Sequence, residues 1–257
     1  MRLYLLDLGR ILCSSNTLYG DGGAEMQPIP VFAVLLDLPQ GKILYDTGCH
    51  PQAMQGYWPT KRAQLSQYVK NAGQGLEEQL HLCGIRPQEI QTVILSHMHF
   101  DHAGGLSLFS HADVYVPQED FICGLLKVHL TSETENHGAY VKNDFEVSVK
   151  AYHLVTHDFF LTPEIEVITL PGHTPGLLGL VVHLKQEGVL IFPQDCLYTA
   201  ANYGPPIKQA GIVADQERYL QSVEKIRMLE EKYKAQVIFG HDMEFFGRLK
   251  HAPAYYQ

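Results

Sequence analysis

The stretch VILSHMHFDHAGG, residues 93–105, constrains the fold of this chain more than any other part of its sequence. An apolar run of the kind that forms a buried strand leads directly into three histidines and an aspartate within six positions. In extended backbone, side chains two residues apart point the same way, so His97 and His99 can bind one metal ion. Asp101 and His102 follow directly in the sequence, and their side chains can face a second metal position beside the first.

Two glycines, Gly104 and Gly105, close the cluster, and we expect them to let the chain turn tightly there. The alternative is a solvent-exposed loop that happens to be rich in histidine. Such a loop would need neither a buried strand in front of it nor a glycine pair behind it. The pattern therefore favours a metal site.

Three further apolar runs each end in a residue that can bind a metal ion: His173 in TLPGHTPG, Asp195 in LIFPQD and His241 in VIFGHD. A single such residue is more often structural, but three of them beside the first cluster favour a shared centre. Zinc prefers four nitrogen and oxygen ligands, and a catalytic site keeps one position open for water. So many ligands therefore suit two neighbouring ions better than one.

The pattern along the chain predicts an α/β fold. We expect strands and helices to alternate in two strand-rich halves, each followed by helices, which favours an α/β/β/α sandwich. A single domain over residues 1–257 is the simplest organisation, with 128–160 as a long irregular segment that covers the substrate. The predicted strands are 3–9, 31–39, 42–48, 92–96, 113–117, 165–172, 177–184, 188–195 and 236–240, and the predicted helices are 61–83, 104–109, 118–130 and 215–234.

Charge and composition narrow the partners. The net charge of −9, with only 19 basic residues, argues against a nucleic-acid substrate, which would need clustered Lys and Arg. Five cysteines without CxxC spacing suit a reducing compartment, and no apolar run approaches the ~20 residues that span a bilayer. We therefore expect a cytoplasmic protein with no membrane partner. The sequence does not determine the oligomeric state, and a dimer is compatible with it.

The HxHxDH run, the later PGHTPG, the aspartate and the final GHD, with Asp46 in LYDTG, resemble the metallo-β-lactamase-fold hydrolases in order across most of the chain. The resemblance implies an αββα sandwich of two mixed β-sheets flanked by helices. It also implies two zinc ions per chain, one held by His97, His99 and His173, the other by Asp101, His102 and His241, with Asp195 bridging them. Asp46 would orient a ligand from behind. Histidine at position 99 favours zinc over a di-iron centre, although cobalt, iron or manganese also suit such ligands.

The segment DCLYTAANYGPP, together with SHMHFDHAGG and YDTGCHP, resembles the quorum-quenching N-acyl-homoserine lactone lactonases. The resemblance implies a hydrolase that opens the lactone ring when a hydroxide bridging the two ions attacks the carbonyl. It places Tyr198, Asp101 and Asp195 in catalysis, with Tyr198 assisting the carbonyl and the departing ring oxygen. Phe100 and Tyr198 would contact the small-molecule lactone, although a plain core contact is as good an interpretation of Phe100. Tyr57, Trp58 and residues 157–160 could wall an acyl groove, but core packing is favoured for them.

Two alternatives remain open. A glyoxalase II-type thioesterase, or another ester hydrolase of this fold, would share the ligands but usually carries a basic helical extension. The present chain ends 16 residues after His241. A metal-binding scaffold without turnover would be expected to lack a ligand, and all seven positions are filled. Secretion signals and positive charge, which a β-lactamase and a nuclease of this fold would need, are not found.

Overall fold

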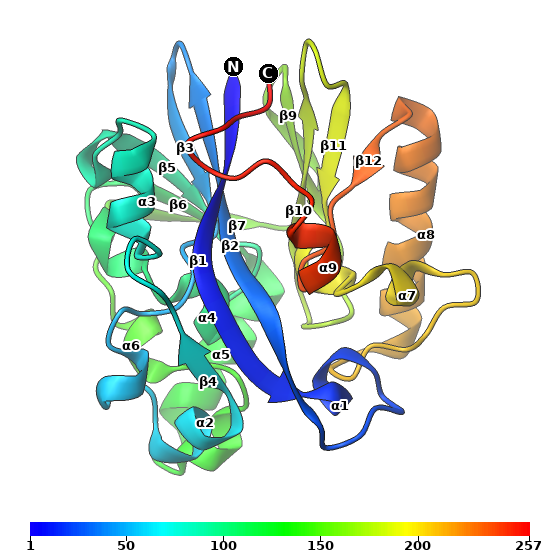
Figure 1. Ribbon diagram of the computed structural model, residues 1–257. Helices are drawn as coiled ribbons and strands as arrows, with labels where there is room; N and C mark the ends of the chain where they lie inside the picture. Colours follow the sequence, from blue (N-terminus) through cyan, green and yellow to red (C-terminus); the bar gives the residue numbers. More distant parts are fainter.

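Two β-sheets packed face to face, with helices on both outer sides, form the computed structural model of this protein (Figure 1). The structure describes the backbone of residues 1–257 and every side chain except that of residue 135. The predicted α/β fold class, an αββα sandwich of two mixed sheets, is confirmed. None of the helices that the structure describes has the length and apolar character needed to cross a bilayer.

The larger sheet has the strand order β4-β1-β2-β3-β5-β6-β7, antiparallel from β4 to β3 and parallel from β3 to β7. Its strands are β1 (Arg2–Ser14), β2 (Met26–Leu38), β3 (Gly41–Tyr45), β4 (Gln67–Val69), β5 (Ile90–Ile94), β6 (Asp113–Pro117) and β7 (Ala151–Val155). The predicted hairpin between β2 and β3 is confirmed by the pairing of Leu38 with Gly41.

The smaller sheet has the order β12-β11-β10-β9-β8, and only its β11–β12 pair is parallel. Its strands are β8 (Phe159–Thr162), β9 (Ile165–Thr169), β10 (Leu178–His183), β11 (Val189–Phe192) and β12 (Gln236–Val237). Because β10 is antiparallel to both neighbours, β9, β11 and β12 all end at the same edge of this sheet.

Alternating side chains explain why the sheets stack. Along β1, Leu3 and Leu5 face the smaller sheet, whereas Leu6 and Leu8 face the helices. This is the period of two that extended backbone imposes. A bulge between Asp7 and Arg10 re-aims the far half of β1, which continues antiparallel to β2 beyond the sandwich. The β1–β2 hairpin therefore serves the core with one half and projects past it with the other.

The α-helices are α1 (Ser15–Leu18), α2 (Thr60–Leu65), α3 (Leu76–Leu82), α4 (Phe100–Ala103), α5 (Gln118–Leu130), α6 (Lys142–Phe145), α7 (Ala200–Tyr203), α8 (Gln216–Tyr233) and α9 (Met243–Phe246). Of these, α3 and α5 cover the outer face of the larger sheet, and α8 covers that of the smaller one (Figure 1). Short 3-10 helices lie at Ala53–Gln55, Pro87–Glu89, Leu106–Phe109, Thr134–His137 and Gln194–Cys196.

Two of the predicted segments differ in the structure. The segment 61–83, expected to be helical with Gly73 and Gly75 as candidate break points, divides into α2, the edge strand β4 and α3. Gly73 interrupts it with a φ of 86°, a left-handed conformation that a helix cannot contain. The segment 128–160, expected to be irregular, contributes β7 and the start of β8 to the two sheets. Only residues 131–150 lie between α5 and β7.

Candidate metal centre

Five of the polar residues singled out in the sequence lie just beyond the carboxyl ends of strands. Asp46 follows β3, His97 follows β5, His173 follows β9, Asp195 follows β11 and His241 follows β12. These strand ends belong to both sheets and meet at one edge of the sandwich. Buried strands thus deliver the side chains, and the fold brings together residues almost 200 positions apart.

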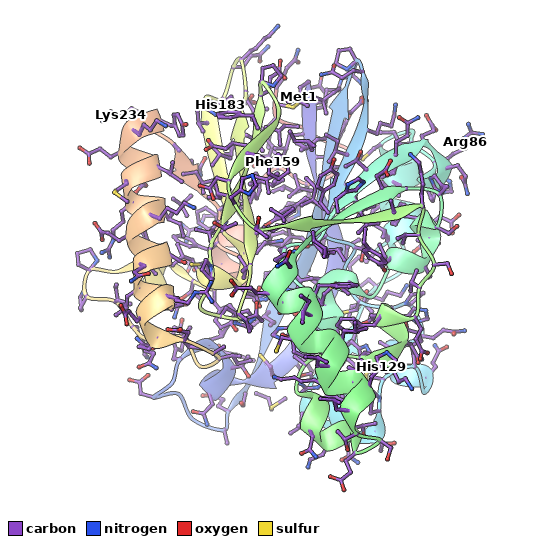
Figure 2. The ribbon with its side chains drawn as sticks, turned by 180° about the vertical axis from the view of Figure 1, so that it is seen from behind. Met1, Arg86, His129, Phe159, His183 and Lys234 are labelled. Atoms are coloured by element: carbon purple, nitrogen blue, oxygen red, sulfur yellow. The ribbon has the colours of Figure 1, made fainter. Side chains whose placement is uncertain are left out.

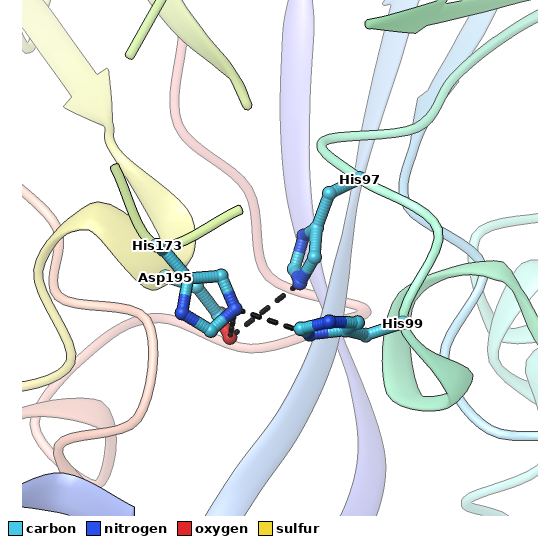
Figure 3. A group of neighbouring side chains, drawn as sticks. All are labelled: His97, His99, His173 and Asp195. Carbon is cyan, nitrogen blue, oxygen red and sulfur yellow. Dashed lines mark hydrogen bonds and ion pairs between the residues drawn. The ribbon is translucent and has the colours of Figure 1, made fainter. Parts of the chain in front are cut away.

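Four side chains form the first group of potential metal ligands: His97, His99, His173 and Asp195 (Figure 3). Their donor atoms lie within 4.8 Å of one another. His99 Nδ1 and His173 Nε2 approach to 3.1 Å, and Asp195 Oδ2 lies 3.2 Å from His173 Nε2 and 3.6 Å from His97 Nε2.

Three more side chains form the second group: Asp101, His102 and His241. Asp195 faces this group with its other oxygen, because Oδ1 lies 3.0 Å from His241 Nε2 and 3.2 Å from His102 Nε2. Asp101 Oδ2 lies 3.7 Å from His102 Nε2 and 3.8 Å from His241 Nε2. One carboxylate therefore stands between two sets of nitrogen donors, an arrangement that suits two ions sharing a ligand.

The side chains themselves fit a pair of divalent ions. All seven are at most 7% exposed. The buried Nε2 atoms of His97 and His102 have no hydrogen-bond partner among the described residues. Buried polar atoms without partners are costly. These two nitrogens belong to different groups, so a cation in each group would supply the missing partner, and nitrogen and carboxylate donors suit zinc and similar transition metals.

Asp46 holds the second group in place. Its Oδ2 lies 2.8 Å from His102 Nδ1, so the opposite ring nitrogen is left to face the centre. The same carboxylate accepts hydrogen bonds from the Ser96 amide (2.6 Å), the Ser96 hydroxyl (2.9 Å) and the Gln194 side chain (2.6 Å). Asp46 and Gln194 both have positive φ, at 61° and 45°, which is unusual for residues with a side chain. The network thus holds strained backbone beside the ligands.

Backbone carbonyls orient two other histidines. His241 Nδ1 lies 3.0 Å from the Pro30 carbonyl, and His173 Nδ1 lies 3.0 Å from the Ile212 carbonyl. A ring nitrogen that faces a carbonyl oxygen carries the proton and donates it. The Nε2 atoms are therefore unprotonated in the neutral rings and available to a metal ion.

The pKa values of the histidines in the two groups shift in opposite directions. Burial, and then neighbouring histidines, lower the pKa values of His97 and His99, and burial also lowers that of His173. Burial opposes the charge of His102 and His241 as well, but Asp195 and Asp101 raise their pKa values. Although burial opposes it, the surrounding histidines hold the pKa of Asp195 well below its usual range. The carboxylate is therefore ionised, as a metal ligand must be.

Asp120, which no pattern in the sequence marks, connects the histidine loop to the structure around it. This fully buried carboxylate accepts hydrogen bonds from the Met98 amide (2.7 Å) and the Tyr140 hydroxyl (2.6 Å). The Tyr140 ring in turn packs edge-on against His99, with centroids 4.8 Å apart. Ser96 and Gln194 were missed in the same way. A serine directly before the cluster and a glutamine directly before Asp195 were the only signals.

The glycine pair is required by close packing and not, as expected, by a tight turn. Gly104 has an ordinary φ of −62°, so no sharp turn requires it. A Cβ on Gly104 would instead lie 2.3 Å from the His50 amide nitrogen, and one on Gly105 would lie 2.4 Å from the Thr47 carbonyl oxygen. The glycines allow the ligand-bearing α4 to pack directly on the backbone of residues 47–50. Asp101 and His102 thus sit on a helical turn.

A cleft of about 460 Å³ opens over the two groups. Its floor includes His99, Asp101, His173, Asp195 and His241, and Tyr198 and Phe100 line it as well. The remaining wall is made by Ile11, Cys13, Thr17, Ile29, Arg62, Ser66, Ala139 and Ile212. Ile11, Cys13 and Ile29 of this wall come from the projecting half of the β1–β2 hairpin, and Ala139 and Ile212 complete its apolar part.

Tyr198 is 1% exposed, and its hydroxyl lies 3.0 Å from His173 Nδ1. Burial raises its pKa well above the usual range, as do Asp195 and Asp101. The phenol therefore stays protonated. Since His173 Nδ1 carries its own proton, the Tyr198 proton is available to an acceptor in the cleft.

Of the other aromatic candidates, only Phe100 lines the cleft. Trp58 is buried with its ring edge-on against Phe100, at 4.6 Å between centroids. Tyr57 donates a hydrogen bond to Asp144 and stacks on His50, so it and Trp58 have the packing contacts favoured for them. Residues 157–160 do not line the cleft either. Phe159 stacks on Tyr115, whereas Phe160 is 57% exposed and is therefore not packed in the core.

The chain belongs to the metallo-beta-lactamase superfamily, whose sequence pattern matches residues 26–241. Within it, the chain is 32% identical to the N-acyl homoserine lactonase AiiB of Agrobacterium fabrum, over 96% of each protein. It is 27% identical to the N-acyl homoserine lactonase AttM of Azorhizobium caulinodans, over 100% of this chain and 98% of the relative.

The fold is similar to that of a solved quorum-quenching N-acyl homoserine lactone lactonase, with a TM-score of 0.84 and 25% identity. The similarity covers 99% of this chain and 97% of the other. With the two ligand groups, these similarities identify the chain as a metal-dependent hydrolase homologous to lactonases.

Proposed function

We propose that this protein is a dinuclear zinc hydrolase that opens the lactone ring of N-acyl-homoserine lactones. The position of Tyr198 carries the proposal, because its hydroxyl lines the same cleft as the metal-ligand groups and keeps its proton. The similarity to N-acyl homoserine lactonases over nearly the whole chain supports the same substrate class. The reducing environment suggested by the five free thiols favours a cytoplasmic location.

In this proposal, His97, His99 and His173 hold one ion, Asp101, His102 and His241 hold the other, and Asp195 is shared. Asp46 keeps His102 in the orientation and tautomer that metal binding requires. Two ions held there would lower the pKa of a water molecule and polarise the carbonyl that it attacks.

Tyr198 acts on the substrate directly. As water adds to the lactone carbonyl, negative charge develops on the carbonyl oxygen, and the buried phenol donates a hydrogen bond to it. The same hydroxyl can donate to the ring oxygen as that oxygen departs. Asp195 and Asp101 both line the cleft, and the proton released by the attacking water passes by way of these carboxylates to the departing ring oxygen, which becomes a hydroxyl group. The ring-opened acid is the product.

The acyl chain has an apolar wall to follow. Ile11, Ile29 and Ile212 line the cleft beside the centre, and Phe100, which also lines it, would contact the lactone end of the substrate. Residues 131–150 cover the site from the other side, since Ala139 lines the cleft and Tyr140 packs on His99. Residues 1–257 act as one domain in this account.

A direct test measures acid release from N-hexanoyl-homoserine lactone in weak buffer by the purified, zinc-loaded protein. We expect close to two metal ions per chain, ring opening, loss of the activity with a chelator, and its recovery when zinc is added back. A matched thioester assay addresses the glyoxalase II-type alternative. If the thioester is cleaved while lactones of short and long acyl chains release no acid, the lactonase proposal fails.

A further inference from the structure

Arg62, on α2, lines two clefts that meet beside the metal centre. The first is the cleft over the ligand groups, and the second is a more open groove of about 950 Å³. The two share the residues Arg62, His99, Ala139, His173 and Ile212. A molecule held at the centre can therefore extend into either cleft, and the Arg62 side chain lies where they join.

The guanidinium of Arg62 is held in place but incompletely paired. It stacks over the ring of Phe100, 5.0 Å from the ring centroid, and its Nη2 donates to the Ser66 hydroxyl at 3.2 Å. Its Nε is buried and has no hydrogen-bond partner among the described residues. No carboxylate of a described side chain lies within ion-pair distance of the guanidinium. Burial lowers the pKa of Arg62, and the negative charge of Asp101 opposes this effect.

An arginine in this condition favours a ligand that brings an acceptor. A guanidinium has five N–H donors in a fixed plane, and stacking on Phe100 sets the direction of that plane. A buried charged donor without an acceptor destabilises the protein, whereas an oxygen from a ligand would remove the penalty. The stack on Phe100 means that little conformational freedom is lost when the oxygen binds.

The second cleft is cationic in an otherwise acidic protein. Lys127 also lines it, with its amino group 5.2 Å from the centroid of the Tyr140 ring. The described side chains that line this cleft include no carboxylate. Because the chain as a whole has a net charge of −9, a local excess of positive charge here points to an electron-rich ligand.

We propose that Arg62 determines substrate specificity by donating hydrogen bonds to an oxygen on the acyl chain, so that chains bearing a carbonyl or carboxylate oxygen are preferred to plain hydrocarbon chains. Oxygen-bearing chains extend into the second cleft, whereas plain chains follow the apolar wall of Ile11 and Ile29 in the first. This inference rests on the proposed lactonase function, and it adds a selectivity that the metal centre alone does not supply.

Three lactones of equal chain length test it: N-hexanoyl-homoserine lactone, its 3-oxo derivative, and the N-adipoyl compound, whose chain ends in a carboxylate. We expect the wild-type protein to show a higher kcat/KM for at least one oxygen-bearing lactone than for the hexanoyl lactone. Arg62→Met should lower kcat/KM for that preferred lactone roughly ten- to hundredfold, the size of one hydrogen bond to a charged group. Its kcat/KM for the hexanoyl lactone should fall by much less, so that the ratio between the two lactones changes, and a metal content equal to that of the wild type shows that the variant folds.

Two further variants guard the interpretation. Arg62→Lys keeps the charge without the planar donor set and should retain part of the preference. Arg86→Met makes the same substitution at an arginine whose side chain is 72% exposed, far from the cleft (Figure 2), and should change nothing.

The outcomes separate the inference from the proposed function. If lactones are opened but the preference is absent or is the same in Arg62→Met, the inference is overturned and the lactonase function stands. A uniform loss on all three lactones in Arg62→Met also overturns it, since Arg62 would then support the site and not the choice of substrate. If the wild-type protein opens none of the three, the proposed function itself is overturned together with the inference.

Discussion

The floor of the active-site cleft and its walls are built in opposite ways. Every ligand of the floor comes from a buried strand end or the adjoining helical turn, and carboxylates or backbone carbonyls orient several of the rings from behind. The walls come from a projecting hairpin, the short α2 and residues 131–150. The unpartnered polar atoms of the floor, His97 Nε2, His102 Nε2 and Asp195 Oδ1, belong to the metal-ligand groups, whereas Arg62 Nε and Asp144 Oδ2 in the walls lack partners among the described residues and belong to neither group. Several contacts therefore hold the side chains of the floor in the positions that metal binding needs, whereas the side chains of the walls are less constrained and can adapt to a substrate.

Removing a floor ligand should have the largest effect. In His102→Ala, we expect the metal content to fall from about two ions per chain to one or fewer, because the second group loses a nitrogen donor. Lactone hydrolysis should fall by more than the roughly hundredfold loss expected for residues that only orient ligands. Metal analysis and acid release measure both. His129→Ala, at the exposed end of α5 (Figure 2), is the control, and equal losses in both variants would contradict the assignment.

Tyr198→Phe tests whether the floor includes a group that acts on the substrate and not on the metals. We expect kcat to fall about a hundredfold, as when one donor to a developing oxyanion is removed, with two metal ions retained. Steady-state kinetics on the metal-loaded variant is the measurement. An unchanged kcat would place Tyr198 among the packing residues of the cleft.

Asp46→Asn tests how strongly the floor depends on support from behind. The amide cannot accept all the hydrogen bonds that Asp46 takes from Ser96, Gln194 and His102. We expect metal affinity to fall roughly ten- to hundredfold while the ligands themselves remain. Competition with a chromogenic chelator gives the affinity. Wild-type affinity in this variant would show that the strand ends alone fix the ligands.

Asp144, in the wall segment, should affect stability and its pH dependence more than chemistry. Burial raises its pKa to about 7, against the smaller lowering by the Tyr57 hydroxyl. The pKa of Asp144 is higher in the folded protein than the unfolded value of about 3.9. The contribution of Asp144 to the free energy of unfolding is therefore fully present below pH 4, where the carboxyl is protonated in both states, and it declines as the pH rises to 7.

Asp144→Asn removes this titration. Relative to the wild type, the variant should gain roughly 2–3 kcal/mol of unfolding free energy between pH 5 and pH 8, because most of the interval between the unfolded and the folded pKa of the wild-type carboxyl lies in this range. Denaturant unfolding across that pH range measures it. If the difference in unfolding free energy between the two proteins is the same at every pH, ionisation of Asp144 does not destabilise the fold. The Asp144 carboxylate would then have more hydrogen-bond partners than the unpartnered Oδ2 indicates.

The same contrast explains what could be predicted from the sequence. The seven ligand positions were visible because each stands after an apolar run or in the short cluster that follows one, and the structure brings their donor atoms together in two groups. Their roles as ligands, and the roles of Asp46 and Phe100, remain predictions, of which His102→Ala and Asp46→Asn test two. Ser96, Gln194 and Asp120 were invisible, because a hydrogen bond across 20 or more positions leaves no local pattern.

The walls were hidden for a related reason. Ile11 and Ile29 lie just outside the predicted strands 3–9 and 31–39, and the bulge in β1 precedes the half of the hairpin that carries them to the cleft. Arg62 lies in a segment expected to be helical, and no spacing in that segment marks it as a residue of the cleft.

The dual use of the β1–β2 hairpin bears on how such an enzyme can diversify. One half of each strand is committed to the sandwich, so an insertion or deletion in β1 would shift the register of Leu3 and Leu5 and expose the core. Point substitutions at Ile11, Cys13 and Ile29 leave that register untouched. Adaptation to new acyl chains should therefore proceed along this wall by exchanging side chains at fixed length, whereas changes in loop length are tolerated on the opposite side, in residues 131–150.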